Sequence, residues 1–321
     1  SEVDWSKHNP DYRGMARLGR ANVGLPAIAG NSLELLDDAE QILRAIISDI
    51  ERAKTSLHLA FYIWHPGGTA DEVVEAVIRA AERGVRCRIL VDAIGSGEWL
   101  RGGHPRRLKE KGVKVKAALT VHPVTTFFRR GDLRYHRKIV VIDGATAYTG
   151  SMNLVDPRFF KQDSDVGQWI DAMVRIRGRV VETLFGVFLS DWSLETETPI
   201  QELAATSGIS HEPSRGPADV QVIPSGPGQG TTADGILQML VMLIYEADEE
   251  IILTTPYFVP DESMLRALRA AASHGVKVDL IVPARVDSFL VRHASRSYYD
   301  ELMEAGVNIQ EFDGGLLHTK S

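Results

Sequence analysis

One stretch of the sequence, YHRKIVVIDGATAYTGSMN at positions 135–153, places an imidazole two residues before an ammonium group. If the stretch begins as a β-strand, side chains two apart share a face, so His136 and Lys138 point the same way. A neutral imidazole brings no negative charge to an anionic phosphodiester, and it leaves readily from the resulting phosphoramidate. A lysine can hold the non-bridging oxygens, whose charge is stabilised by fixed donors. These two residues are therefore candidates for phosphoryl-transfer chemistry that needs no metal.

A turn signal, Asp143-Gly144, follows this strand, and the chain is expected to return along residues 146–150 as a hairpin. A two-residue loop would set His136 opposite Ser151, and a four-residue loop would set it opposite Asn153. Either register predicts a hydroxyl or an amide beside the imidazole and the ammonium.

The spacing of these residues resembles the HKD motif of the phospholipase D superfamily. The fixed positions of that motif are all present, as His136, Lys138, Asp143, Gly150, Ser151 and Asn153. A lone His-x-Lys would fit an ordinary hairpin with exposed polar groups, but the additional Asp and Gly-Ser-x-Asn make coincidence a poor explanation. The resemblance implies that His136, Lys138 and Asp143 are catalytic and that Ser151 and Asn153 support the phosphate.

Alternating strands and helices are expected to position this stretch. Apolar periodicity and turn residues predict strands at 33–36, 57–64, 85–91 and 169–176, and helices at 37–54, 69–83 and 179–193. Such alternation indicates an α/β fold, with a largely parallel sheet covered by helices on both faces. Sheets of this kind bind ligands at the carboxyl ends of their strands.

The pattern then repeats, and His318-Thr319-Lys320 falls where His136-Arg137-Lys138 stood in the first copy. We predict two tandem phospholipase D-like α/β/α sandwich units, each with a mixed, mostly parallel sheet, related by a pseudo-two-fold. The predicted organisation is a lead-in at 1–30, a first domain at 31–196, a linker at 197–218 and a second domain at 219–321, truncated within its motif. The second copy supplies His318 and Lys320 as further catalytic residues, because a second imidazole must protonate the departing oxygen.

A carboxylate, Asp171, lies in an otherwise apolar predicted strand, where it would be costly without a partner. In the superfamily an acid after the Gly-Ser-x-Asn element hydrogen-bonds the histidine and fixes its tautomer. The resemblance makes Asp171 the first candidate for this role and Asp165 the second. The alternative is a carboxylate that caps a segment or faces solvent.

Basic residues dominate the segment from Arg101 to Lys138, which predicts a local positive field leading to the His-Lys strand. For residues 106–116 the alternative is a solvated helix face. Further along, two aromatic and two cationic side chains are adjacent, and this pairing suits contact with an anionic lipid surface. These side chains are Phe127, Phe128, Arg129 and Arg130. The alternative is a loop whose phenylalanines pack into the core.

The composition excludes several classes of protein. The formal net charge of −7 argues against a nucleic-acid binder, which usually has a basic balance. The single cysteine, Cys87, excludes an intramolecular disulfide and a cysteine zinc site, and we expect it in the core. No run of about 18 apolar residues is present, so no spanning helix is expected in this chain. Because the sequence starts without Met and stops inside a motif, we take it as part of a longer protein.

The sequence flanking the motif is similar to that of the bacterial cardiolipin synthases of this superfamily. The similarity lies in YHRKIVVIDG, AYTGSMNLVDPRFFKQ, WIDAMVRIRG, TTPYFVPD and GGLLHTKS. It implies that two phosphatidylglycerol molecules, as donor and acceptor, are joined into cardiolipin plus glycerol through a phosphatidyl-histidine. His136 is then the nucleophile and His318 the acid/base, with the reverse assignment open. It further implies no cofactor and no metal, an anionic membrane surface as partner, and attachment to the bacterial cytoplasmic (inner) membrane.

Two other functions fit the same residues. A phospholipase D or another phosphodiesterase would use water as the acceptor and release phosphatidic acid or cleaved nucleic acid. A non-catalytic module would only bind anionic membranes. The sequence leaves the oligomeric state open.

Overall fold

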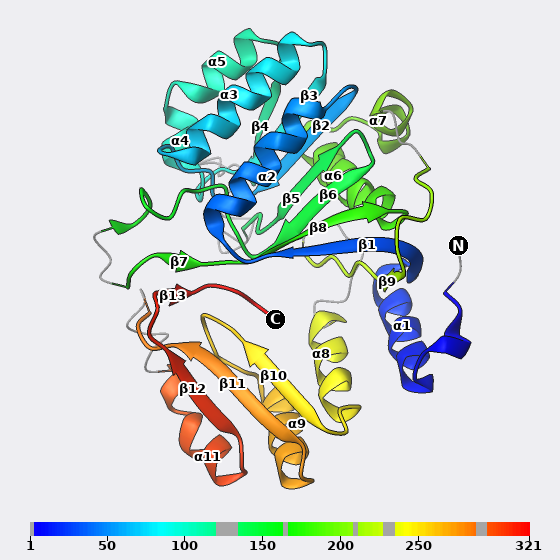
Figure 1. Ribbon diagram of the computed structural model, residues 1–321, viewed down its shortest axis with the longest axis vertical. Helices are drawn as coiled ribbons and strands as arrows, with labels where there is room; N and C mark the ends of the chain where they lie inside the picture. The colour runs from blue at the N-terminus through cyan, green and yellow to red at the C-terminus, as the bar shows by residue number, and fades with distance from the viewer. Residues whose placement is uncertain (1–2, 120–133, 163–165, 208–210, 227–234, 287–293) are drawn as a thin grey trace. The chain divides into compact units, whose positions relative to one another are not determined.

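The computed structural model describes residues 3–119, 134–162, 166–207, 211–226, 235–286 and 294–321 (Figure 1). The chain forms two compact units. Unit 1 consists of Ser1–Val3, Ile28–Phe160 and Ala172–Val222, and unit 2 consists of Asp4–Ala27, Lys161–Asp171 and Ile223–Ser321. The units differ from the domains predicted above. Residues 4–27 and 161–171 belong to unit 2, and the predicted linker 197–218, together with residues 219–222, belongs to unit 1. The predicted domain boundaries stay a prediction.

Unit 1 is built on an eight-stranded sheet with the strand order β4-β3-β2-β5-β6-β8-β1-β9. Its strands are β1 Ile28–Leu36, β2 Ser56–Phe61, β3 Arg86–Asp92, β4 Lys114–Ala118, β5 Lys138–Ile142, β6 Thr146–Gly150, β8 Met173–Gly178 and β9 Ala218–Val220. The pairs β2–β3 and β3–β4 are parallel, and the other pairs are antiparallel. The sheet is therefore mixed, with its parallel part at one edge.

Helices cover both faces of this sheet and make unit 1 a three-layer α/β/α structure. The helices are α2 Ala39–Arg52, α3 Thr69–Glu82, α4 Gly97–Arg101, α5 His104–Glu110, α6 Val180–Thr196 and α7 Ile200–Ser207. Alternate residues of β5 reveal the layers, since Val140 and Ile142 join the core under α2 and α3 while Ile139 and Val141 join the core under α6. Each such aliphatic side chain contributes roughly 1.5–3 kcal/mol when fully buried.

Unit 2 contains a three-stranded sheet with the order β10-β11-β12 and a separate pair, β7 with β13. These strands are β10 Glu250–Thr254, β11 Lys277–Pro283, β12 Asn308–Phe312, β7 Trp169–Ile170 and β13 Leu316–Leu317. All pairs in both sheets are parallel. The helical elements are η1 Trp5–Lys7, α1 Pro10–Val23, α8 Gly235–Tyr245, α9 Glu262–Ser273 and α11 Tyr299–Glu304.

Corresponding strands of the two units pair in the same way. The parallel order β12-β11-β10 matches β4-β3-β2. Ala60 of β2 pairs with Ile139, the residue after Lys138. Thr254 of β10 exchanges backbone hydrogen bonds of 2.8 and 3.2 Å with Ser321, the residue after Lys320. The α/β class is confirmed, and the described strands support the predicted internal repeat.

The β5–β6 hairpin differs from both predicted registers. Ile142 pairs with Thr146, so the loop has three residues, 143–145, and not two or four. Continuing this register sets Lys138 opposite Gly150, and neither Ser151 nor Asn153 lies directly opposite His136. The predicted registers were wrong because the turn does not follow the two-residue pattern typical of Asp-Gly. Asp143 and Gly144 both have positive φ, 54° and 65°, and a third residue completes the loop.

Candidate active site

The first His-Lys pair stands where β5 begins, beside the carboxyl end of β2. Phe61, the last residue of β2, pairs with Lys138, and the N–H of Tyr62 donates to the Arg137 carbonyl at 2.9 Å. The imidazole of His136 is exposed, whereas Lys138 is buried and its Nζ donates to the His136 carbonyl at 3.3 Å. The chain at the start of β5 thus presents an accessible imidazole, and the ammonium group of Lys138 is held on the carbonyl of the same histidine.

Gly150, the last residue of β6, pairs with Met173, the first residue of β8. A Cβ at this position would lie 2.3 Å from the Ala172 carbonyl oxygen, so only glycine fits. Ser151 is buried next to it, donating its N–H to the same carbonyl at 2.9 Å while its Oγ accepts from the Ala172 N–H at 3.1 Å. Asn153 is also buried, and its Oδ1 accepts from the Ile63 N–H at 3.1 Å. These contacts shape the loop, and the role of Ser151 and Asn153 at a phosphate stays a prediction.

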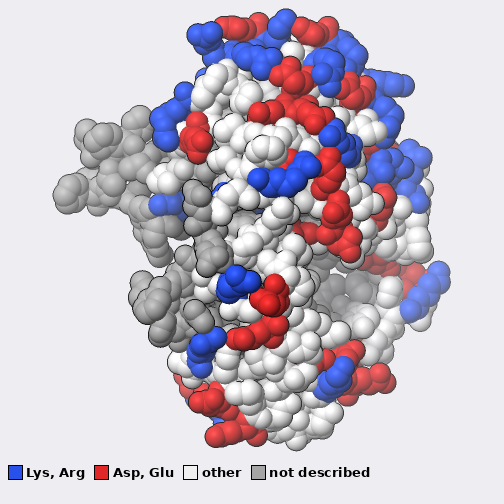
Figure 2. Space-filling view, turned by 60° about the vertical axis from the view of Figure 1, so that its left-hand side comes forward, with Lys and Arg blue, Asp and Glu red and all other residues white. Residues whose placement is uncertain are grey.

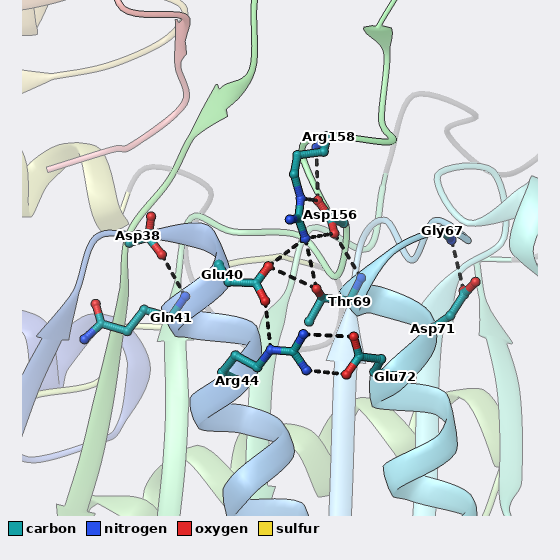
Figure 3. Close-up of polar contacts among 10 residues, drawn as sticks. All are labelled: Asp38, Glu40, Gln41, Arg44, Gly67, Thr69, Asp71, Glu72, Asp156 and Arg158. Atoms are coloured by element: carbon teal, nitrogen blue, oxygen red, sulfur yellow. Dashed lines mark hydrogen bonds and ion pairs between the residues drawn. The ribbon is translucent and has the colours of Figure 1, made fainter.

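A polar network fixes the segment that follows Asn153 (Figure 3). Asp156 accepts from the Thr69 N–H at 2.9 Å and caps the start of α3. Arg158 bonds Asp156 through Nη2 at 2.6 Å and Glu40 of α2 at the same distance. Burial opposes ionisation, yet the hydrogen bond from Arg158 and those from backbone N–H groups lower the pKa of Asp156 to about 2. The loop carrying Ser151 and Asn153 is therefore tied to the amino ends of two helices.

The carboxylate of Asp143 lies at the other end of β5 from Lys138, roughly 17 Å away by the rise of an extended strand. It accepts from the N–H groups of Lys54, Thr55 and Ser56 at 2.9, 2.7 and 3.0 Å, and from the Thr55 hydroxyl at 2.9 Å. These contacts hold the segment between α2 and β2 against the hairpin turn. The catalytic role assigned to Asp143 above stays a prediction, and its contacts indicate support of the fold.

Replacing Asp143 with alanine is expected to lower the free energy of unfolding by about 2–3 kcal/mol, because hydrogen bonds to a charged acceptor are lost from a half-buried site. Burial disfavours the ionised carboxylate, but the backbone hydrogen bonds outweigh burial and lower the pKa of Asp143 below its ordinary value. This stabilisation is present above an unfolded pKa of roughly 3.9 and disappears as the pH falls through the lower folded value. Urea unfolding of the two proteins at pH 7 and in acid measures this difference.

The matched control for this change is Asp37→Ala, which removes an exposed carboxylate from unit 1. Its unfolding free energy should stay within about 0.5 kcal/mol of the unchanged protein. A fully stable Asp143→Ala protein that has lost activity would instead support the catalytic assignment of Asp143.

The second His-Lys pair lies in unit 2, directly after β13. His318 and Asp171 are both buried, and Nδ1 of His318 lies 2.7 Å from Oδ1 of Asp171. The carboxylate therefore has the partner that its burial requires. With the Nδ1 proton directed to Asp171, the nitrogen of His318 that remains for chemistry is Nε2, which lies 3.3 Å from the Lys320 ammonium. Lys320 donates from Nζ to the His318 carbonyl at 2.9 Å, as Lys138 does to His136.

The chain brings Asp171 to His318 by an unexpected route. Residues 161–171 follow the first motif in sequence but belong to unit 2, where β7 pairs with β13. Asp171 thus forms a hydrogen bond with the histidine of the second motif. The strand predicted at 169–176 is accordingly divided into β7 and β8, which lie in different sheets.

Two aromatic residues at the site were not predicted from the sequence. The ring of Tyr62 lies 4.9 Å from the His136 ring, and the ring of Trp169 lies 4.3 Å from the His318 ring, measured between centroids. The sequence held a signal for each, since Tyr62 directly follows β2, the strand that β5 joins, and Trp169 stands two residues before Asp171.

The basic segment divides into two parts. Arg107 bonds Glu75 at 2.7 and 3.0 Å, and Lys111 bonds Glu82 at 2.6 Å. Figure 2 shows basic and acidic side chains interspersed over the part of unit 1 that carries α3 and α5. The residues around α5 thus form the solvated, ion-paired face given above as the alternative. Phe127, Phe128, Arg129 and Arg130 lie outside the described residues, as does Asp165, and the predicted membrane contact stays a prediction.

Comparison with protein families matches both motif-bearing parts of the chain to one family. The family is described as "Cardiolipin synthase, PLD-like domain", and the match covers residues 46–192 and 240–321. The chain belongs to this family. Both His-Lys pairs of this cardiolipin synthase-type, PLD-like chain lie inside the matched residues. The resemblance to the phospholipase D superfamily is confirmed.

Curated relatives of this PLD-like chain carry the name cardiolipin synthase A. The protein of Yersinia pseudotuberculosis serotype O:1b (strain IP 31758) is 47% identical over 298 residues, which are 93% of this chain and 61% of that protein. The protein of Edwardsiella ictaluri (strain 93-146) is 45% identical over 318 residues, which are 99% of this chain and 65% of that protein. The chain spans less than two thirds of the length of these relatives.

A solved structure shows the same fold. The phosphatidylserine synthase of Haemophilus influenzae Rd KW20 is 13% identical, with a TM-score of 0.64 over 96% of this PLD-like chain and 79% of that one. Within the part of the chain that the structure describes, no helix combines the length and the apolar character needed to cross a bilayer.

Proposed function

We propose that this PLD-like chain is the catalytic part of a phosphatidyltransferase that joins two phosphatidylglycerol molecules into cardiolipin and glycerol. The observation that carries the proposal is the repeated geometry of the two His-Lys pairs. In each pair the lysine ammonium is held on the carbonyl of the histidine two residues before it, at 3.3 and 2.9 Å. The chain therefore offers two imidazoles and two cations, which a two-step displacement at an anionic phosphorus requires.

In the first proposed step, a ring nitrogen of His136 attacks the phosphorus of one phosphatidylglycerol. The nitrogen–phosphorus bond forms, the bond from phosphorus to the glycerol oxygen breaks, and His318 gives that oxygen a proton from Nε2. The lysines of both pairs hold the non-bridging oxygens as charge builds up on them. Asp171 keeps the other proton of His318 on Nδ1, 2.7 Å away.

In the second proposed step, His318 takes a proton from a headgroup hydroxyl of the second phosphatidylglycerol. That oxygen attacks the phosphorus, and the bond to His136 breaks. Both substrates are anionic lipids, so the proposed setting is an anionic membrane surface, in bacteria the cytoplasmic (inner) membrane. Ser151 and Asn153 are proposed to support the phosphate in both steps.

The exposure of His136 favours hydrolysis as the second candidate, since water can reach an exposed phosphoenzyme. Incubation of the full-length protein with phosphatidylglycerol vesicles distinguishes the two functions. Mass spectrometry of the lipid products, with an enzymatic assay for free glycerol, should give cardiolipin and glycerol in equal amounts. If phosphatidic acid is the lone lipid product, the proposed transferase activity is wrong and the protein is a phospholipase D.

A further inference from the structure

An aromatic ring lies against the imidazole of each His-Lys pair. In unit 1 the ring of Tyr62 is inclined by 45° to that of His136, with 4.9 Å between centroids. In unit 2 the ring of Trp169 is inclined by 37° to that of His318, with 4.3 Å between centroids. The two rings come from different places in the fold, since Tyr62 directly follows β2 and Trp169 begins β7. The contact is thus made twice by unrelated segments.

Each of these rings also faces a lysine ammonium. Lys138 Nζ lies 5.3 Å from the centroid of Tyr62, and Lys161 Nζ lies 5.1 Å from the centroid of Trp169. A ring that already attracts one ammonium group gives less electrostatic stabilisation to a second positive charge, such as a protonated imidazole. Electrostatic stabilisation of an imidazolium is therefore the smaller part of what the rings do, and contact with the imidazole is the larger part.

Tyr62 is held firmly in unit 1. Its carbonyl accepts from Ser96 Oγ at 3.0 Å, and Ser96 is buried. Its N–H donates to the Arg137 carbonyl, between the two motif residues. Gly95 also lies close to this residue, because an added Cβ there would lie 2.5 Å from the Tyr62 carbonyl oxygen and 2.7 Å from Cε2. The partly buried ring thus has both a glycine and the His-Lys pair as close neighbours.

Trp169 is held equally firmly in unit 2. It is buried and pairs with Leu316 in the β7–β13 ladder. The His318 N–H donates to the Ile170 carbonyl at 2.8 Å, so backbone and ring contacts both link β7 to this histidine. Gly315 has φ of 135° and passes so close to Gln168 that a Cβ would lie 2.4 Å from its carbonyl oxygen. The close approach of the two strands depends on that glycine.

We infer that Tyr62 and Trp169 are positioning residues, which hold the imidazoles of His136 and His318 in the orientation that phosphoryl transfer needs. This inference rests on the proposed function. An imidazole without its ring gains side-chain rotamers, and a displacement of about 1 Å at a reacting atom can cost about 10²-fold in rate. The rings do not touch the reacting atoms in this scheme, so their loss lowers kcat and leaves KM nearly unchanged.

The first test compares two substitutions of Tyr62 in the full-length protein with phosphatidylglycerol vesicles. Tyr62→Leu, which removes the ring, is expected to lower kcat about 30-fold with KM within about 2-fold. Tyr62→Phe keeps the ring and should retain kcat within about 3-fold. Equal kcat values for the two variants, or a loss confined to KM, would overturn the inference for Tyr62. Trp169→Leu and Trp169→Phe form the same comparison for His318.

A second variant acts on the Tyr62 ring without changing it. Gly95→Ala introduces a methyl group that the Tyr62 backbone and ring must move to accommodate, and kcat should fall as it does in Tyr62→Leu. The control is Gly103→Ala in the next loop, where an added Cβ meets nothing within 4 Å. If Gly95→Ala and Gly103→Ala have the same kcat, the position of the ring is irrelevant and the inference is wrong.

A spectroscopic test separates this inference from the proposed reaction. The ring current of Tyr62 shifts the His136 ring-proton resonances, which can be followed in protein labelled at histidine. Tyr62→Leu should move these resonances, and Tyr62→Phe should leave them close to their original positions. Unchanged resonances in Tyr62→Leu would contradict a contact between the Tyr62 and His136 rings, whichever product the enzyme forms. Absence of cardiolipin from the unchanged protein, with the resonances behaving as expected, would overturn the proposed function alone.

Discussion

Replacement of His136 by alanine is expected to lower cardiolipin formation by at least about 10⁴-fold and to abolish any covalent phosphatidyl-enzyme. The size of the effect follows from the proposed role, because no other group on this strand can form the nitrogen–phosphorus bond in its place. Lys138, two residues away, is buried with its ammonium on the His136 carbonyl. Incubation with phosphatidylglycerol labelled in an acyl chain, followed by denaturing electrophoresis, measures the adduct directly.

The matched control is His274→Ala, in which the lost imidazole is exposed at the end of α9 and bonds its own helix at the Ala270 carbonyl. This variant should keep both activity and adduct. A labelled adduct that persists in His136→Ala but disappears in His318→Ala would reverse the roles of the two histidines. An adduct that persists in both variants would mean that neither histidine is the nucleophile.

The local elements of the fold could be predicted because they are encoded by short-range patterns. The helix expected at 37–54 is α2, 39–52, and Asp38 caps it through the Gln41 N–H at 2.8 Å. The strand of the first motif is β5, and its alternation places Val140 and Ile139 in different cores, as a period of two requires. The match between His136 and His318 was equally visible in the sequence, since like segments precede both.

Features that depend on distant segments could not be predicted in this way. The turn at Asp143 is held by hydrogen bonds from the backbone N–H groups of residues 54–56. The sequence of the hairpin itself contains no pattern that predicts these hydrogen bonds. The hairpin register, which depends on this turn, was consequently wrong. Tyr62 reads as one more strand residue in the sequence, and only pairing of β2 with β5 brings its ring to His136.

The partner of Asp171 illustrates the same limit. Its position after Gly-Ser-x-Asn and its apolar surroundings identified a carboxylate that needs a partner. The sequence did not indicate that residues 161–171 leave unit 1, so it could not show that His318 receives the hydrogen bond. The residue types could be predicted from the sequence, but the way they pair depends on topology.

Replacement of Asp171 by asparagine is expected to lower kcat about 10³-fold with a small change in KM. The reason is the tautomer of His318. An asparagine amide can turn its NH₂ group toward Nδ1, which moves the ring proton to Nε2 and removes the base that must activate the second lipid hydroxyl. Because Asp171 and His318 are both buried, water cannot easily replace the lost acceptor. Steady-state kinetics with phosphatidylglycerol vesicles measures kcat and KM separately.

Two comparisons make this prediction specific. Asp165→Asn changes the second carboxylate that the sequence proposed for the same role, and its kcat should stay within about 3-fold of the unchanged protein. Thermal unfolding of Asp171→Asn shows whether the protein is folded at the assay temperature, so that a loss of rate is not a loss of structure. A normal kcat in Asp171→Asn, or a loss found in Asp165→Asn instead, would mean that the 2.7 Å contact with His318 is structural and has no part in catalysis.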